Sequence, residues 1–229
     1  SMTLLIGIFF FVLLMNCAEA ATLTVDPTPG VGDYITIQAA VNAATAGDTI
    51  WVSSGTYYEN VDVNKALTLQ GVDSGSGLPV VDGGGSGGAI TLSADGCSLQ
   101  GFVARNSGSA NYGITVSSSS NTISGNTVNG NNQRGISLNS SNFNTISGNS
   151  VTDAIQHGIY LTSSSNNTIS SNTANGNSGS GIYLTTTSNS NIVSANTASN
   201  NQYGIRLYAS KGNTITGNTA NNNDDGFRI

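Results

Sequence analysis

The six residues 121–126 read NTISGN, and this motif decides the fold because it returns four more times along the chain. The later copies are NTISGN at 144–149, NTISSN at 167–172, NIVSAN at 191–196 and NTITGN at 213–218. Their starting positions 121, 144, 167, 191 and 213 are therefore 23, 23, 24 and 22 residues apart. A Gly-Ile pair keeps the same period, at 113–114, 135–136, 158–159, 181–182 and 204–205. Such a period indicates stacked units that bury their apolar faces on one another.

Each unit holds three short segments in which apolar and polar residues alternate, as they do in half-buried β-strands. In the unit at 158–180, these segments begin at Gly158, Asn167 and Asn172. Three strands per ~23 residues, joined by Gly, Asn and Ser turns, predict a three-sided coil whose successive turns pair as parallel strands. Counting the segments predicts an all-β solenoid of about eight coils.

One Asn per coil is predicted to form a ladder inside the solenoid. These residues are Asn126, Asn149, Asn172, Asn196 and Asn218. A buried Asn is costly unless its amide is hydrogen-bonded. Stacked one above another, the amides can bond to each other and to the turn backbone, as in cross-β stacks.

The N-terminal segment has a different character from the repeats. Residues 4–15 form an apolar run that is too short to span a bilayer comfortably and is typical of a signal peptide. The sequence Ala18-Glu19-Ala20 then supplies a cleavage pattern, but no positive charge precedes the apolar run. We therefore interpret residues 1–20 as a signal peptide or a retained hydrophobic segment. A signal peptide predicts a secreted or cell-surface protein.

Residues 21–229 are predicted to form one β-helix domain. A short α-helix within 34–47 is expected to cap its N-terminal end, because Thr36 offers an N-cap and an apolar stripe follows it. That stripe is formed by Ile37, Ala40, Val41 and Ala44. The alternating strands of residues 48–96 predict irregular first coils, and residues 97–229 contain the regular repeats.

The composition excludes some functions. Charged residues make up 8% of the chain, the net charge is −6, and six Lys plus Arg cannot form the basic surface of a nucleic-acid binder. After residue 20 the only Cys is Cys97, which is predicted to be a small buried hydrophobe. No paired-Cys metal signature is present, so we predict neither a metal nor a cofactor.

Residues 34–71 resemble the opening of right-handed parallel β-helix proteins of the pectate-lyase-like class. The repeat GIYLTSSSNNTISSNTANGN at 158–177 is similar to the β-helix of NosD-type copper-accessory proteins and to repeats in archaeal surface proteins. The resemblance implies a single-stranded, right-handed parallel β-helix. It does not imply one function, because this fold hosts lyases, hydrolases, adhesins and structural proteins. Copper handling would need clustered His, Met or Cys, and after residue 20 only His157 and Cys97 are available.

Catalytic chemistry finds little support in the sequence. Glycoside hydrolysis needs two facing carboxylates, and Asp153 is the only acid between Leu99 and Asn223. The N-terminal acids are placed on different turns: Asp62, Asp73, Asp82 and Asp95. By resemblance, a lyase would need carboxylate-held Ca²⁺ beside a base such as Arg206, and no carboxylate pair accompanies that residue. We assign no catalytic residue. A polysaccharide lyase or glycoside hydrolase remains the alternative to a non-enzymatic role.

An outward column of Tyr and Arg is the best candidate binding surface. The predicted residues are Tyr112, Tyr160, Tyr183, Tyr203, Arg206, Tyr208 and Arg228. Tyr and Arg one coil apart, at ~4.8 Å, could stack on sugar rings and bond to their hydroxyl groups. The leading hypothesis is a structural or adhesive protein that binds polysaccharide or a cell-surface glycan.

Two other features suggest further hypotheses. A Thr-rich outward column partly resembles that of ice-binding β-solenoids, and it includes Thr122, Thr145, Thr168 and Thr214. The last segment, 226–229, has no predicted capping element after it, and an open coil is a template for pairing with another chain. Either the natural chain continues past Ile229, or copies associate end to end into a homo-oligomer or filament.

Overall fold

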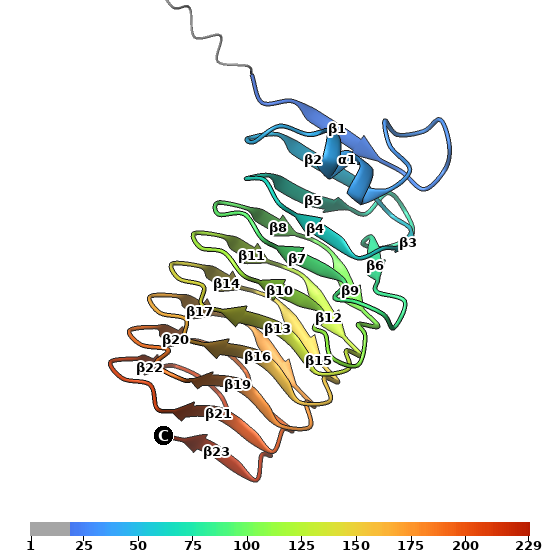
Figure 1. Ribbon diagram of the computed structural model, residues 1–229. Helices are drawn as coiled ribbons and strands as arrows, with labels where there is room; N and C mark the ends of the chain where they lie inside the picture. The colour runs from blue at the N-terminus through green and yellow to red at the C-terminus, as the bar shows by residue number, and fades with distance from the viewer. Residues whose placement is uncertain (1–18) are drawn as a thin grey trace, which may run out of the picture.

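The computed structural model describes residues 19–229. The prediction for residues 1–20 thus falls almost wholly outside the described range. The described chain winds into a three-sided rod of stacked coils (Figure 1). Within it there are 23 β-strands and one short α-helix. No helix of residues 19–229 is long and apolar enough to cross a membrane.

The strands form three parallel sheets, and the chain visits sheets A, B and C in turn. Sheet A contains β1 (Thr22–Val25), β2 (Thr49–Ser53), β5 (Thr68–Val72), β8 (Ser98–Gln100), β11 (Thr122–Ser124), β14 (Thr145–Ser147), β17 (Thr168–Ser170), β20 (Ile192–Ser194) and β22 (Thr214–Thr216). Sheet B contains β3 (Thr56–Tyr58), β6 (Val80–Asp82), β9 (Val103–Arg105), β12 (Thr127–Asn129), β15 (Ser150–Thr152) and β18 (Thr173–Asn175). Sheet C contains β4 (Val61–Val63), β7 (Ile90–Leu92), β10 (Ile114–Val116), β13 (Arg134–Asn139), β16 (His157–Thr162), β19 (Ser180–Thr185), β21 (Tyr203–Tyr208) and β23 (Asp225–Arg228).

The predicted parallel β-helix with about 23 residues per turn is confirmed. The register follows the sequence repeat, because Ile146 pairs with Ile169 and Ile159 with Ile182. The nine strands of sheet A give about nine turns, one more than the eight expected. The additional strand is β1, an extended lead-in that pairs in parallel with β2.

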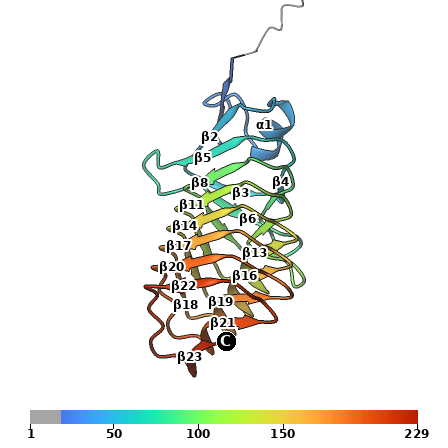
Figure 2. The same cartoon turned by 90° about the vertical axis from the view of Figure 1, so that its left-hand side faces the viewer.

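Helix α1 (Ile37–Ala43) closes the N-terminal end of the coil, and it is shorter than the segment 34–47 within which it was expected (Figure 2). The Thr36 side chain accepts a hydrogen bond from the Ala39 N–H at its N-terminus. The two carboxylate oxygens of Glu59 accept the N–H groups of Ile37 and Gln38, both at 2.9 Å. At the other end, the Lys65 ammonium donates to three backbone carbonyls, those of Val41, Asn42 and Ala44. Opposite charges thus satisfy both ends of the helix.

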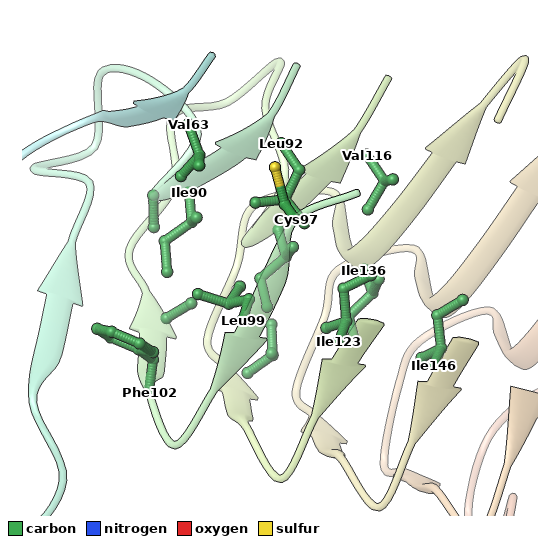
Figure 3. Close-up of a cluster of buried hydrophobic side chains, with 14 of the residues drawn as sticks. Val63, Ile90, Leu92, Cys97, Leu99, Phe102, Val116, Ile123, Ile136 and Ile146 are labelled. Carbon is green, nitrogen blue, oxygen red and sulfur yellow. The ribbon is translucent and has the colours of Figure 1, made fainter. Parts of the chain in front are cut away.

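Aliphatic side chains from all three sheets fill the interior of the coil (Figure 3). Cys97 lies among them with 2% of its surface exposed, as predicted for a small buried hydrophobe. Burial raises the pKa of its thiol. Phe102 is fully buried and occupies the position of the ladder Asn in its coil, where its N–H donates to Asn126 Oδ1.

The predicted Asn ladder lies at the corner between sheets A and B. Asn126, Asn149, Asn172 and Asn196 are each 1% exposed, whereas Asn218 in the last ladder position is partly exposed. Asn172 illustrates the pattern, since its Oδ1 accepts the N–H and the Nδ2–H of Asn149 at 3.0 and 2.9 Å. Its own N and Nδ2 donate to the Oδ1 of Asn196 at 2.9 and 3.0 Å, and Nδ2 also reaches the Ile146 carbonyl. Each amide is therefore fully satisfied.

Two more Asn ladders follow the other corners, and the sequence analysis missed them as ladders. Beside sheet A run Asn121, Asn144, Asn167, Asn191 and Asn213. Between sheets B and C run Asn131, Asn177, Asn201 and Asn223, with Ala154 in the place of one Asn. All three corners thus carry buried amides that hold one coil to the next.

Candidate functional site

The outer face of sheet C is the part of the described surface where aromatic and cationic side chains gather. One column along its strands reads Thr115, Ser137, Tyr160, Tyr183, Arg206 and Arg228. A neighbouring column is formed by the residues that directly precede the repeating glycine of each coil. It reads Arg134, His157, Ser180, Tyr203 and Asp225. We call the surface formed by Tyr112, Arg134, His157, Tyr160, Tyr183, Tyr203, Arg206 and Arg228 the Tyr/Arg face.

On β16, Gly158 separates the residues of the two columns, His157 and Tyr160. A Cβ at Gly158 would lie 2.7 Å from the backbone oxygen of Gly181, so the tight approach of adjacent coils leaves no space for a side chain. His157, just before this glycine, and Tyr160, two residues after it, both lie on the outer face. Their rings stack with centroids 5.5 Å apart and an interplanar angle of 11°. The sequence repeat therefore places two side chains of one strand in contact.

The first cluster is built around Arg134. Its guanidinium lies over the ring of Tyr160 at 3.5 Å and near the ring of Tyr112 at 4.9 Å. The Nη1 group donates to the Tyr112 hydroxyl at 3.2 Å. Arg134 is half-buried, and its Nε is buried without a hydrogen-bond partner. This guanidinium is thus largely engaged with the protein itself.

His157 links the two halves of the face. Its Nδ1 accepts the backbone N–H of Ser180 at 3.0 Å, so a neutral imidazole carries its proton on Nε2. The ring also meets Tyr183 edge-on at 5.0 Å. Burial, with a further contribution from Arg134 and Arg206, lowers the pKa of His157 to about 4. At neutral pH, His157 is therefore an uncharged hydrogen-bond donor.

The second cluster is built around Arg206. Its guanidinium lies 4.8 Å from the ring centroid of Tyr183 and 5.0 Å from that of Tyr203. Arg228 approaches the same Tyr203 ring at 5.1 Å and donates to its hydroxyl at 2.9 Å. Arg228 also pairs with Asp225 at 3.8 Å. The two clusters form an alternating series of rings and guanidinium groups.

The structure brings six of the seven predicted binding residues into these clusters. Tyr208 is the exception, because it lies one column further along β21 with 62% of its surface exposed. The predicted set omitted Arg134 and gave no role to His157. Both precede the glycine of the Gly-Ile pair, and that position was the available signal.

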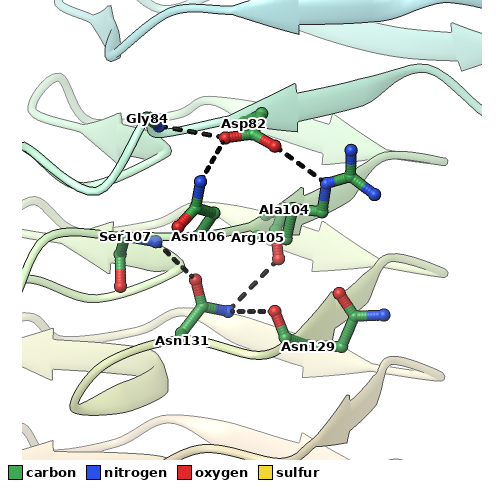
Figure 4. Close-up of polar contacts among 8 residues, drawn as sticks. All are labelled: Asp82, Gly84, Ala104, Arg105, Asn106, Ser107, Asn129 and Asn131. Carbon is green, nitrogen blue, oxygen red and sulfur yellow. Dashed lines mark hydrogen bonds and ion pairs between the residues drawn. The ribbon is translucent and has the colours of Figure 1, made fainter.

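The N-terminal acids do not form a catalytic pair. A small cavity of about 110 Å³ is lined by Tyr58, Glu59, Asn60, Asp82, Gly83, Gly84 and Ser86. Asp82 accepts hydrogen bonds from Asn106, Gly84 and Arg105 at 2.8, 3.0 and 3.0 Å (Figure 4). Burial raises the pKa of Asp82, but these hydrogen bonds outweigh it and hold the pKa below its usual value. The Glu59 carboxylate already accepts the N–H groups of Ile37 and Gln38 at the start of α1. Both carboxylates thus already accept hydrogen bonds within the protein.

The other acids of the first coils each serve a local hydrogen bond. Asp62 accepts from the Ser93 hydroxyl, Asp73 from the N–H groups of Gly75 and Gly77, and Asp95 from the N–H of Ser119. Asp62 lies on β4, whereas Asp73 follows β5 and Asp95 follows β7, so the three acids occupy different strands or loops. In residues 19–229 no three His, Cys, Asp or Glu side chains gather in a way that could hold a metal ion.

Sheet A presents a contrasting outer face. Its central strands align Thr122, Thr145 and Thr168 in one column, which Ile192 interrupts with 46% of its surface exposed. Ice binding by this face remains a prediction, which a thermal-hysteresis measurement on the purified protein would test.

Comparison with known proteins places the chain in a family. The family model described as "Periplasmic copper-binding protein (NosD)" matches residues 41–229. No curated protein matches the chain.

Solved structures that are similar to this chain share its fold at low sequence identity. Pectate lyase Pel9A has a TM-score of 0.66 at 16% identity, over 90% of this chain and 67% of its own. The periplasmic alginate epimerase AlgG has a TM-score of 0.58 at 14% identity, over 86% of this chain and 55% of its own. The A-module of the Azotobacter vinelandii mannuronan C-5 epimerase AlgE6 has a TM-score of 0.55 at 18% identity, over 82% of this chain and 71% of its own.

The family's description implies copper, and the described residues do not fit it. His157 and Cys97 are the only His and Cys among residues 19–229, and no Met is present there. The Cys97 sulfur contacts backbone carbonyls in the core, whereas His157 lies on the outer face with Nδ1 already bonded. A Cu site needs several such ligands together. Because this family model matches most of the chain, the chain belongs to the NosD family, although residues 19–229 lack the clustered ligands that copper binding requires.

Proposed function

We propose that this protein is a non-enzymatic, extracytoplasmic binding protein that holds a polysaccharide against the Tyr/Arg face. The observation that carries the proposal is the uneven distribution of charge and rings. Three of the six Lys and Arg residues, Arg134, Arg206 and Arg228, lie on this one face of a chain whose net charge is −6. Rings and guanidinium groups on one surface suit sugars, which offer apolar faces and hydroxyl groups.

The shape of the face favours an extended ligand. The aromatic and cationic residues follow the solenoid across five successive strands, β13, β16, β19, β21 and β23, so they span about 19 Å at 4.8 Å per coil. The cavity of about 110 Å³ lies elsewhere, beside β3 and β6. A small metabolite would need a concave pocket, whereas a polymer can lie along a flat row of contacts.

Catalysis remains the rival class. Three structural neighbours are named as enzymes, namely a pectate lyase, an alginate epimerase and a mannuronan C-5 epimerase, and their likeness to this chain supports the fold. On the Tyr/Arg face, His157 presents a protonated Nε2 rather than a free base at neutral pH. Asp225, the acid in the second column, is paired with Arg228. These contacts favour binding over proton transfer.

A polysaccharide panel tests the proposal. The purified protein should bind one or more soluble polysaccharides in an affinity-gel or calorimetric assay and release neither unsaturated nor reducing ends. The double change Tyr160→Ala and Tyr183→Ala should weaken binding by about tenfold, since each ring contact contributes about 0.5–1.5 kcal/mol. Tyr58→Ala is the matched control, because Tyr58 is 76% exposed on sheet B. Equal losses in both variants would contradict the proposed face, and released products would favour the lyase or hydrolase.

The predicted location and assembly extend the same proposal. A periplasmic family agrees with a position outside the cytoplasm, and we propose secretion or display at the cell surface. Detection in the culture medium or by surface labelling of cells would test it.

Association of copies through the last described coil also remains a proposal, supported by Phe227 at 50% exposure. Because α1 covers the opposite end, electron microscopy should show paired rods, and single rods only would contradict association.

A further inference from the structure

We propose that Arg206 is the oxyanion-binding residue of the Tyr/Arg face, so that the polysaccharide it takes is an acidic one. The oxyanion would be a uronic carboxylate or a sulfate ester of the polymer. This inference rests on the proposed function and adds the charge class of its ligand. It follows from the state of the cationic side chains.

Most cations of the described chain already have a partner. Arg105 pairs with the buried Asp82 at 3.0 Å, and Lys65 is occupied by the carbonyl groups of α1. Arg134 bonds to the Tyr112 hydroxyl, and Arg228 bonds to the Tyr203 hydroxyl. Each of these side chains therefore already makes at least one polar contact within the protein.

Arg206 differs from them in its free donors, while it lies against tyrosine rings as Arg134 and Arg228 do. Its guanidinium donates to no protein atom and pairs with no carboxylate within residues 19–229. It is also held in place, because Tyr183 and Tyr203 contact it at 4.8 and 5.0 Å. Lys211 likewise has no side-chain partner, but it is exposed on a turn and no ring contacts it.

An oxyanion site needs a cationic side chain whose position is restrained and whose N–H groups are free, and the Arg206 guanidinium meets both conditions. The planar guanidinium can offer two parallel N–H groups to one carboxylate. The tyrosine rings reduce the side-chain entropy that binding would otherwise cost. Arg206 is half-buried, so the interaction is less screened than that of an exposed turn lysine. The site therefore favours an anionic group over a neutral sugar.

The test compares one polymer with its own neutral form. Binding of a polyuronate and of the same polyuronate after carboxyl reduction is measured by calorimetry at fixed salt, with a sulfated glycan as a third ligand. Arg206→Met should weaken polyuronate binding about 10- to 100-fold, because a hydrogen bond to a charged group contributes about 1.5–3 kcal/mol. Arg206→Lys keeps the charge but loses the fork, and it should weaken binding by a smaller factor. The anionic polymer whose affinity falls more in Arg206→Met identifies the group.

Lys211→Met is the control, since it removes the same charge away from the rings and should change affinity less than twofold. Circular dichroism melts verify that each variant is folded. Equal binding of the polyuronate and its reduced form by the natural protein would overturn the inference while leaving the proposed function intact. Failure to bind any of the three polymers would overturn both. An equal loss in Lys211→Met and Arg206→Met would show a long-range charge effect and also overturn the assignment.

Discussion

The Asn ladders and the Tyr/Arg face are built by the same coils but follow opposite rules. At the corners, the residue hardly changes, and Asn149, Asn172 and Asn196 make the same hydrogen bonds one coil after another. On the outer face of sheet C, the equivalent column changes from Ser137 to Tyr160 and later to Arg206. A residue whose only role is to hydrogen-bond adjacent coils can be the same in every coil. An outer residue that changes from coil to coil has no such role and is available to contact a ligand.

Replacing a ladder residue should have the largest effect on stability. In Asn172→Leu, the buried carbonyl of Ile146 and two donors of Asn149 lose their partner, and each orphaned group costs about 1–3 kcal/mol. We expect the free energy of unfolding in urea to fall by about 3–5 kcal/mol. Asn129→Leu on the outer side of β12 should change it by less than about 0.5 kcal/mol. Similar losses in the two variants would remove the distinction between corner and face.

Gly158→Ala should cause a smaller loss in the free energy of unfolding. This glycine lies beside the ladder residue Asn177 and between His157 and Tyr160 of the Tyr/Arg face. The new Cβ would lie 2.7 Å from the Gly181 carbonyl and 2.8 Å from the Asn177 amide nitrogen, and backbone cannot yield easily there. Overpacking of this kind costs about 1–3 kcal/mol. The change should also reduce ligand affinity, because His157 and Tyr160 flank the glycine. Gly130→Ala, at a turn with no atom near its Cβ but with φ of +59°, provides a strained control that should spare affinity.

The pH dependence of stability isolates one residue of the face. The pKa of His157 is lowered from 6.5 to about 4, so folding favours the neutral ring. Its contribution is complete above pH 6.5, declines as the pH falls toward 4, and is constant below that value. After allowance for screening of a partly exposed ring, we expect a loss of about 1–2 kcal/mol across this window.

His157→Asn is the matched variant for that titration. The Asn Oδ1 can replace Nδ1 as the acceptor for the Ser180 N–H, but it does not titrate. The stability of the natural protein relative to the variant should therefore fall as the pH drops from 6.5 to 4 and stay constant outside this window. Identical pH profiles for both proteins would show that burial and the nearby Arg134 and Arg206 do not lower the pKa of His157.

The smallest expected effect on stability is that of the residue proposed to bind the ligand. Arg206→Met removes a half-buried side chain that has no hydrogen bond to the protein, and its contacts with Tyr183 and Tyr203 contribute only about 0.5–1 kcal/mol. We expect a change in the free energy of unfolding within that range, measured in urea. A loss as large as that of Asn172→Leu would assign Arg206 to the fold rather than to a ligand.

The sequence predicted what depends on the period. The steps between NTISGN copies gave the coil length, and the alternation in residues 158–175 gave the buried Ile159, Leu161 and Ile169. Lateral contacts could not be predicted. Arg134 lies over Tyr160 of the next coil, and the periodic pattern does not specify how side chains of adjacent coils lean toward one another. The extra ladders were missed for two reasons. Asn167 begins a predicted segment, but its stacking between Asn144 and Asn191 shows only when the coils are aligned. Asn177 follows the last predicted segment of its unit.

Side-chain footprinting with a bound acidic polysaccharide tests the central claim most directly. The account predicts protection of Tyr160, Tyr183 and Arg206 on β16, β19 and β21. It predicts no protection of Ile192 on sheet A or of Tyr58 on sheet B, which are 46% and 76% exposed in the same protein. Protection confined to sheet A or sheet B, with the Tyr/Arg face still reactive, would contradict it.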